Sequence, residues 1–323
     1  MGFLRAVPLC CAAGLASSAA NQATAAPTFS VVIDDPGGFL APYATELEAA
    51  TLAAADLWGR ELESDASIEI LIQSSFSVPR ATGRSFVSAF RDQINGLFIV
   101  DQGMGYEIRT GIDPNGTAPD VELRLNPDYV ANEFWFDPDP AARTAPVPSD
   151  RLDAVSVMLH ELGHALVYNG FINDFDGTYP DAFRSTFDYL TEFSGEHFFH
   201  VGTQCQGHYG GPVPLTFGLT DHWGNFGGPG EDLIFELMNG LVFFFGRRYH
   251  VSDLDRAVIV DCGLPLRTRC PADFNNDGQA DFFDYLDFAL AYSNEDPAAD
   301  FNQDAQVDFF DYLDFVAAFD VGC

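Results

Sequence analysis

The stretch His160-Glu161-Leu162-Gly163-His164 lies in a run with helical apolar spacing from residue 150 to residue 168. Because an α-helix turns about 100° per residue, two histidines four positions apart stand about 40° apart on one face, about 6 Å along the axis. Two imidazoles so placed can bind one Zn²⁺, and Glu161 then lies near the open coordination position, where a bound water needs a base. We therefore predict His160 and His164 as zinc ligands and Glu161 as a general base; the alternative is a helix with two merely polar histidines.

The expected helix has recognisable start and stop signals. Ser149 or Asp150 follows the helix-breaking run Pro146-Val147-Pro148 and suits an N-cap, and Gly170 is the expected stop. The zinc-motif helix is therefore expected to span about 150–168.

The charge of the chain excludes some classes of partner. The 323 residues carry a formal net charge of −33 and include no lysine. Nucleic acid and anionic membrane surfaces both require basic patches, so we expect neither as a partner. A chain of this length allows one large domain or two.

The N-terminal residues resemble an export signal. Arg5 precedes the apolar run 6–16, and Ala23-Thr24-Ala25 fits a cleavage site, with cleavage after Ala20 as an alternative. No other stretch reaches the roughly 18 apolar residues of a membrane span. We predict a signal peptide at 1–25 and an exported, secreted mature chain without a membrane span.

Four cysteines remain after the signal, and an oxidising compartment favours disulfides. Four cysteines allow three pairings, of which we prefer the one whose second bond brackets a distinct segment. The preferred pairs are Cys205 with Cys262 and Cys270 with Cys323.

The first half of the chain alternates between strand and helix patterns. The expected elements are strands at 29–33, 68–72, 96–100 and 121–125, a helix at 47–62, and a short helix or loop at 83–95. Interleaved strands and helices favour an α/β (α+β) fold with a mixed sheet packed against the helix.

The second half is rich in glycine and aromatic residues and shows little periodicity over 171–230. Catalytic zinc sites keep three protein ligands and one open position, so the third ligand is to be sought there. His222 and Glu192 are the alternatives. Short helices are expected at 232–241 and 252–260, the latter with Ser252 and Asp255 as a capping pair.

Several separated motifs together resemble the secreted metzincin-type zinc peptidases, nearest to the leishmanolysin-like branch. They are H-E-L-G-H-A-L from His160, G-H-Y-G-G-P-V-P-L from Gly207, D-H-W from Asp221, E-L-M from Glu236 and V-S-D-L-D-R-A-V-I-V-D-C-G from Val251. The resemblance implies a peptidase domain over 26–265, with His160, His164 and His222 as zinc ligands, Glu161 as the base and Met238 in a turn beneath the metal.

One departure keeps Glu192 open as the third ligand. Val167 and Gly170 stand where the strict metzincin string has glycine and the third histidine. The helix could therefore run one turn longer before it bends at Gly170.

The segment 270–323 is acidic and internally repeated at a spacing of 27 residues. In each repeat, oxygen-bearing residues stand at positions 1, 3, 5, 7, 9 and 12, as a Ca²⁺ loop requires. The expected calcium ligands are Asp273, Asn275, Asp277, Gln279, Asp281 and Asp284 in the first loop, and Asp300, Asn302, Asp304, Gln306, Asp308 and Asp311 in the second. Ala305 replaces the turn glycine of the second loop, so we expect that loop to bind more weakly.

Each loop continues into the same eight residues, Asp-Phe-Phe-Asp-Tyr-Leu-Asp-Phe, at 281–288 and 308–315. A duplicated EF-hand-like loop followed by a helix resembles dockerin modules, which implies a small all-α module and a cohesin-like protein partner; a calcium-stabilised end cap is the alternative. We therefore predict that the whole chain is an exported zinc endopeptidase acting on peptides or proteins. The alternative is a non-catalytic extracellular assembly or surface-attachment protein with an inactive metzincin-like domain.

Overall fold

The computed structural model describes residues 25–322 except 241–242, 276–278, 295–298 and 303–305. The predicted signal peptide therefore lies outside the described residues, apart from its last position. The chain is a mixed α/β protein, as predicted, with several mixed sheets and helices between the strands.

The largest part of the fold is a four-stranded sheet in the order β1-β2-β6-β3. Strands β1 (Thr28–Asp34), β2 (Ser67–Ser74) and β6 (Val121–Leu125) run parallel, whereas β3 (Ala81–Ser85) pairs antiparallel with β6 at the edge. The strands predicted at 29–33, 68–72 and 121–125 are confirmed.

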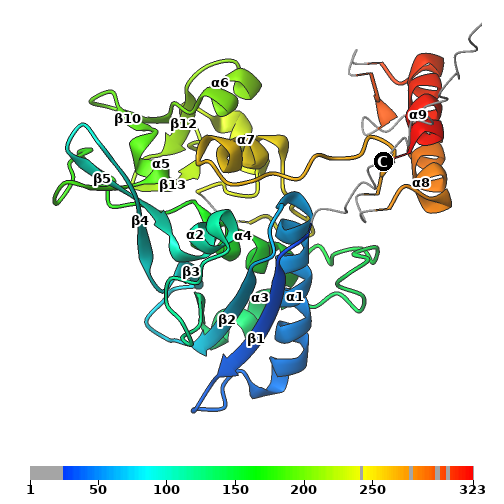
Figure 1. The fold of residues 1–323 in the computed structure, drawn as a ribbon. Helices are drawn as coiled ribbons and strands as arrows, with labels where there is room; N and C mark the ends of the chain where they lie inside the picture. Colours follow the sequence, from blue (N-terminus) through cyan, green and yellow to red (C-terminus); the bar gives the residue numbers. More distant parts are fainter. Residues whose placement is uncertain (1–24, 241–242, 276–278, 295–298, 303–305, 323) are drawn as a thin grey trace, which may run out of the picture.

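Helices α1 (Ala44–Glu61) and α4 (Ala154–Leu166) supply most of the core beside this sheet. Along β2, Ile68, Ile70 and Ile72 are buried and the residues between them are exposed or half-buried, so the strand turns one face to the helices. Figure 1 shows α1 alongside β1 and β2. The indole Nε1 of Trp58 donates to the carbonyl of Leu159 at 2.8 Å, which joins α1 to the zinc-motif helix α4.

The prediction of a short helix or loop at 83–95 was wrong. This segment contains most of β3 and the strand β4 (Ser88–Ile94), which pairs antiparallel with β5 (Leu97–Gln102). In β4 no side chain is fully buried, so the apolar alternation that would reveal a strand is weak. Helix α2 (Gly103–Thr110) follows β5 and was not predicted.

The zinc-motif helix begins later than predicted. Its N-cap is Asp153, whose carboxylate accepts from the N–H of Ser156, and not Ser149 or Asp150. The buried guanidinium of Arg143 donates to the same carboxylate at 2.6 Å and to the carbonyl of Tyr249 at 3.0 Å. Asp153 is therefore held as a cap by a second segment of the chain, which local sequence does not reveal.

The helix also ends earlier than Gly170, because α4 stops at Leu166 with Val167 as C-cap. The extra turn expected from the departure at Val167 does not form. The imidazole Nδ1 of His164 lies 2.7 Å from the carbonyl of Tyr168, which places the chain just after the helix beside this histidine.

Residues 171–230 contain more regular structure than their sequence indicates. A second sheet has the order β10-β11-β12-β13, formed by β10 (Thr191–Phe193), β11 (Phe198–His200), β12 (Val213–Thr216) and β13 (Leu219–Trp223). The remaining short elements are η1 (Ala41–Tyr43), α3 (Pro127–Glu133), β7 (Phe134–Trp135), β8 (Leu152–Asp153), β9 (Phe183–Ser185), α5 (Thr186–Tyr189) and α6 (Thr203–Tyr209).

Of the two helices predicted near the end of this region, one is confirmed. Helix α7 (Asp253–Asp261) begins with the predicted capping box of Ser252 and Asp255. The helix expected at 232–241 is instead the short 3₁₀ turn η2 (Glu231–Phe235), and the backbone is extended at the next residue, Glu236.

The C-terminal segment has its own core. Helices α8 (Phe282–Ser293) and α9 (Phe309–Val321) follow the two repeated loops, and Phe288 stacks on Phe315 with ring centroids 4.0 Å apart. In Figure 1 these helices stand apart from the sheets, at the end of an extended stretch of chain.

The predicted bond between Cys205 and Cys262 is not present, since both are free, buried thiols. The thiols have different partners: Cys205 hydrogen-bonds Asp261, and Cys262 hydrogen-bonds Thr186. Cys270 is disulfide-bonded; its predicted partner Cys323 lies outside the described residues, so that pairing stays a prediction.

Among the described residues, no helix has both the length and the apolar character needed to cross a membrane.

Candidate metal centre

Three imidazole nitrogens meet at the middle of α4. The Nε2 atom of His160 lies 3.1 Å from that of His164 and 3.2 Å from that of His222, and the Nε2 atoms of His164 and His222 lie 3.1 Å apart. His160 and His164 come from one face of α4 and His222 comes from β13. Zn–N bonds of about 2.0–2.1 Å in tetrahedral geometry separate ligand nitrogens by about 3.3 Å, so one ion can contact all three.

The other nitrogen of each ring is engaged by an acceptor. His160 Nδ1 lies 2.8 Å from the carbonyl of Leu237, His164 Nδ1 lies 2.7 Å from that of Tyr168, and His222 Nδ1 lies 2.7 Å from Oδ1 of Asp221. Carbonyl and carboxylate oxygens only accept, so all three Nδ1 atoms carry the proton. Neutral rings then turn three Nε2 lone pairs toward one point, an arrangement that a cation stabilises.

Burial shifts the protonation of these groups. Burial and the neighbouring imidazoles lower the pKa of His160 well below its usual value, and burial lowers the pKa of His164 to about 4. Burial also opposes protonation of His222, but the carboxylate of Asp221 outweighs it and raises its pKa. His222 is therefore the first of the three to accept a proton on acidification.

Glu161 is buried at the start of the same turn of α4. Burial raises the pKa of its carboxyl to about 7, although His222 in its protonated form and the backbone N–H of Gly83 oppose this. A group with such a pKa can accept and return a proton near neutral pH.

The edge strand β3 packs closely on the helix that carries this glutamate. A Cβ atom on Gly83 would lie 1.9 Å from the backbone oxygen of Glu161, so only glycine fits there. The Oγ of Ser85 donates to the carbonyl of Ala165 at 2.8 Å, which fixes the strand along α4.

The structure brings His160, His164 and His222 together and does not bring the alternative ligand Glu192 to them. Met238 is fully buried, with its sulfur directly against Gly163 of α4. Glu192, the alternative third ligand, is exposed on β10 and does not belong to the cluster of His160, His164 and His222.

The acceptors of the Nδ1 protons were not found from the sequence. Asp221 had a usable signal, because an aspartate directly before a candidate histidine ligand can hold its ring. The carbonyls of Leu237 and Tyr168 have no sequence signal, because any residue type supplies a backbone oxygen.

The predicted calcium loops are described in part. Asp277 and Asp304 lie outside the described residues. The carboxylate of Asp284 accepts from the N–H groups of Asn275 and Asp281 at 3.0 and 2.7 Å, and Asp311 accepts in the same way from Asn302 and Asp308. The other predicted ligands Asp273, Gln279, Asp300 and Gln306 are at least partly exposed.

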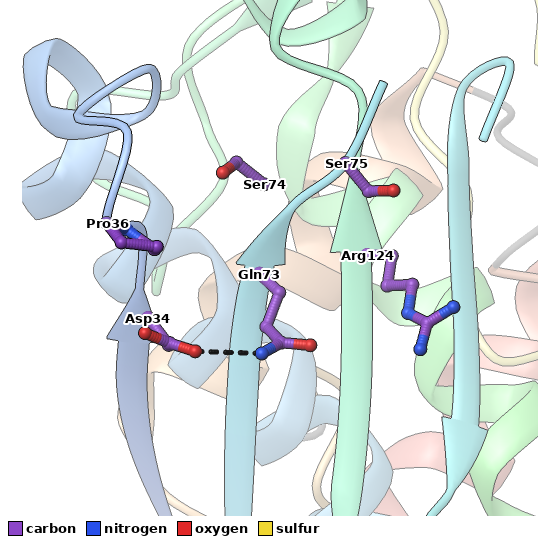
Figure 2. A pocket seen from close by; sticks show the side chains of 6 residues that line it. All are labelled: Asp34, Pro36, Gln73, Ser74, Ser75 and Arg124. Atoms are coloured by element: carbon purple, nitrogen blue, oxygen red, sulfur yellow. Dashed lines mark hydrogen bonds between the residues drawn. The ribbon is translucent and has the colours of Figure 1, made fainter. Parts of the chain in front are cut away.

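Beside the histidines lies a hollow of about 260 Å³ that is mainly apolar. Its wall includes Tyr129, Leu152 and Phe243, and the ring of Phe243 lies 5.1 Å from that of His160. A second hollow of about 290 Å³ lies at the ends of β1 and β2 and contains Asp34, Gln73 and Arg124 (Figure 2). Its lining shares no residue with the histidine cluster.

No family model matches the chain, and no curated protein or solved structure matches it.

Proposed function

We propose that the chain is a zinc-dependent endopeptidase in which His160, His164 and His222 hold the ion. The observation that carries this proposal is the triangle of Nε2 atoms 3.1–3.2 Å apart, each presented by a ring whose Nδ1 proton is already engaged. Nitrogen ligands and an open fourth position are typical of catalytic zinc.

The reaction then follows from the position of Glu161. A bound Zn²⁺ supplies a water of lowered pKa and polarises the carbonyl of the scissile peptide bond. The carboxylate of Glu161 accepts the proton of the attacking water and later returns it to the leaving amine. Its buried position keeps bulk water from competing for that proton.

The edge strand β3 and the hollow beside His160 support a peptide as the substrate. Strand β3 hydrogen-bonds β6 on one side, and among the described strands none pairs with its other side. An extended peptide can add to such an edge through its main chain. The aromatic wall with Phe243 suits an apolar side chain of that peptide.

The metzincin-type assignment, nearest to the leishmanolysin-like branch, belongs to the same proposal. It is supported by the parallel sheet with an antiparallel edge strand, by the ligand His222 on a distant strand, and by Met238 packed under α4. Export through residues 1–25 remains part of the proposal.

We further propose that residues 270–323 form a calcium-dependent, dockerin-like module that binds a cohesin-like protein. The duplicated phenylalanines support a binding surface, because Phe282, Phe283, Phe309 and Phe310 are 60–64% exposed on the two helices. The same surface supports the second candidate function, a non-catalytic assembly or attachment protein.

The Glu161→Ala variant separates the two candidates. A zinc peptidase loses cleavage of an unfolded protein substrate by at least about 100-fold, because general acid–base catalysis contributes that much, while it keeps one zinc per chain. Unchanged cleavage in a zinc-loaded variant contradicts the peptidase, and a wild-type chain that binds zinc but cleaves nothing supports the assembly protein. Asp221→Asn is a second informative variant, since it keeps the base and changes the carboxylate that holds His222 and lies 3.5 Å from Nδ1 of His164.

A further inference from the structure

A group of carboxylates of the kind that can hold a metal ion lies far from the histidines in sequence, around the loop that joins α2 to β6. Carboxylate oxygens of Glu107, Asp113 and Asp120 lie within 4.8 Å of one another. Glu107 belongs to α2, Asp113 to the loop, and Asp120 directly precedes β6.

Several oxygens in and beside this group are buried without an N–H or O–H donor from the rest of the protein. They are Oε2 of Glu107 and Oδ1 of Asp120, together with Oδ1 of Asn115 in the adjoining loop. The residues Glu107 and Asp120 are only 5% and 1% exposed. Each buried, unsatisfied oxygen destabilises the fold unless a ligand binds it.

The remaining polar atoms of these side chains hold them in place. The second carboxylate oxygen of Glu107 accepts from the N–H of Ser67 at 3.1 Å, and that of Asp120 accepts from the N–H of Glu69 at 2.9 Å. One oxygen of each carboxylate is therefore held by a backbone N–H, and the other oxygen remains able to bind a ligand.

Hydrogen bonds within the loop likewise hold the side chains of Asp113 and Asn115 in place. Asp113 Oδ1 accepts from the N–H groups of Asn115 and Gly116 at 2.8 and 2.7 Å. The amide Nδ2 of Asn115 donates to the carbonyls of Ala118 and Pro119, which leaves its Oδ1 free to act as a ligand.

The charges that act on this group are negative. Burial raises the pKa of Glu107 and the charges of Asp113 and Glu69 raise it further, whereas the hydrogen bond from the N–H of Ser67 and a hydrogen bond shared with Asp120 lower it. Burial raises the pKa of Asp120 to about 7; the N–H of Glu69 opposes this, and a hydrogen bond shared with the side chain of Glu69 and the charges of Glu107 and Glu69 add to it. The neighbouring guanidinium of Arg109 is occupied by Asp101, with a hydrogen bond of 2.9 Å from its Nε.

We propose that Glu107, Asp113, Asn115 and Asp120 bind a calcium ion that ties the start of β6 to α2. All four donors are oxygens, which a hard cation prefers, and Ca²⁺ accepts irregular sets of six to eight oxygen ligands. Asp113 is exposed, so water can complete the coordination. Zinc prefers nitrogen and sulfur ligands and Mg²⁺ demands a near-ideal octahedron, so both fit this donor set less well.

Such an ion would support the proposed catalytic site indirectly. The carboxylates of Glu107 and Asp120 hold the N–H groups of Ser67 and Glu69 on β2, and β6 lies between β2 and the edge strand β3. Calcium would therefore stabilise the sheet against which α4 packs. The proposal does not depend on the histidine centre being catalytic.

The test is thermal unfolding of the full chain followed by tryptophan fluorescence, in calcium-depleted buffer with zinc held constant and with CaCl₂ added. All three tryptophans lie in the first 223 residues, so this signal does not report the C-terminal loops. We expect calcium to raise the unfolding midpoint by about 5 °C at saturation. Calorimetry in an Asp273→Ala, Asp300→Ala background, which removes a ligand from each C-terminal loop, should then show one bound Ca²⁺.

Asp120→Asn is the decisive variant, because its amide oxygen can still accept from Glu69 while the charge is lost. We expect it to be at least as stable as the parent without calcium, to gain nothing from calcium, and to bind one ion fewer in the otherwise natural chain. Asp65→Asn, an exposed neighbour outside the group, should keep the calcium response.

Two results would overturn the proposal. One is a parent chain whose unfolding midpoint, followed by tryptophan fluorescence, does not respond to millimolar calcium. In that case a free energy of unfolding that falls as the pH rises toward 7 would indicate that Glu107 and Asp120 share a proton instead of a metal ion. The other is an Asp120→Asn variant that keeps the full calcium response.

Discussion

Gly163 lies directly against Met238, because a Cβ atom on Gly163 would stand 2.7 Å from the sulfur of that methionine. The helix that carries two of the three histidines is thus seated on the turn that carries Met238, and the carbonyl of the preceding Leu237 holds the ring of His160. A side chain at position 163 would therefore push the buried methionine out of its place under the helix.

Gly163→Ala should therefore displace α4 from the turn. We expect a loss of about 1–3 kcal/mol in the free energy of unfolding, as for other overpacked cores, and weaker zinc binding. Gly207→Ala on α6 is the matched control, since a Cβ there meets nothing within 4 Å. Equal stability of both variants in denaturant unfolding would contradict the close contact.

Gly83→Ala tests whether strand β3 positions the proposed base, Glu161. The added Cβ would lie 1.9 Å from the backbone oxygen of Glu161, so β3 must move away from α4. We expect kcat/KM to fall at least tenfold while one zinc per chain is retained. Thr82→Ala, at an exposed neighbouring position, should keep both; a Gly83→Ala variant of full activity would show that the strand does not position the site.

His200 should make the protein acid-sensitive. Burial lowers its pKa from 6.5 to about 4, and neither ring nitrogen has a hydrogen-bond partner. The unfolded chain takes up this proton below pH 6.5 and the folded chain does not, so stability present above pH 6.5 is lost as the pH falls toward 4. The loss is on the order of 3 kcal/mol.

His200→Phe should remove this pH dependence, because phenylalanine can keep the stacking on Phe187, whose ring centroid lies 4.9 Å away. The measurement is the free energy of unfolding at pH 7 and pH 4.5, with His197→Phe, at a half-buried position on the same segment, as the control. Lower stability of His200→Phe at pH 7 would contradict this view and would fit a metal held by His200, Cys205 and Asp261 instead.

Calcium binding by the C-terminal loops should depend on Asp273. In Asp273→Ala we expect calorimetric heat from the first loop to disappear, because position 1 supplies a carboxylate ligand. Asp287→Ala, which changes an exposed carboxylate on α8 outside the loop positions, should leave the heat unchanged. No heat for the wild type at millimolar calcium would contradict the predicted loops.

Local patterns in the sequence predicted the parts of the site that lie on one element. His160, Glu161 and His164 share one helix, so a spacing of four residues is enough to place them together. The capping box of Ser252 and Asp255 is local for the same reason.

The remaining features depend on contacts between distant segments. His222 reaches the site through a sheet formed from residues 191–223, where the sequence shows little periodicity. The N-cap Asp153 depends on Arg143, and the strand β3 depends on pairing with β6. The predicted bond between Cys205 and Cys262 was wrong for the same reason, because the number and spacing of cysteines do not show which side chain each thiol contacts in the fold.

The zinc content of His222→Ala compared with that of Glu192→Ala tests the three-histidine centre most directly. Both proteins would be loaded with zinc, dialysed and analysed for bound metal, with folding checked by circular dichroism. We expect one zinc per chain in the wild type and in Glu192→Ala, and less than about a tenth of that in folded His222→Ala, because two imidazoles alone hold zinc weakly. Zinc retained by His222→Ala, or lost from a folded Glu192→Ala, would contradict the centre described by the structure.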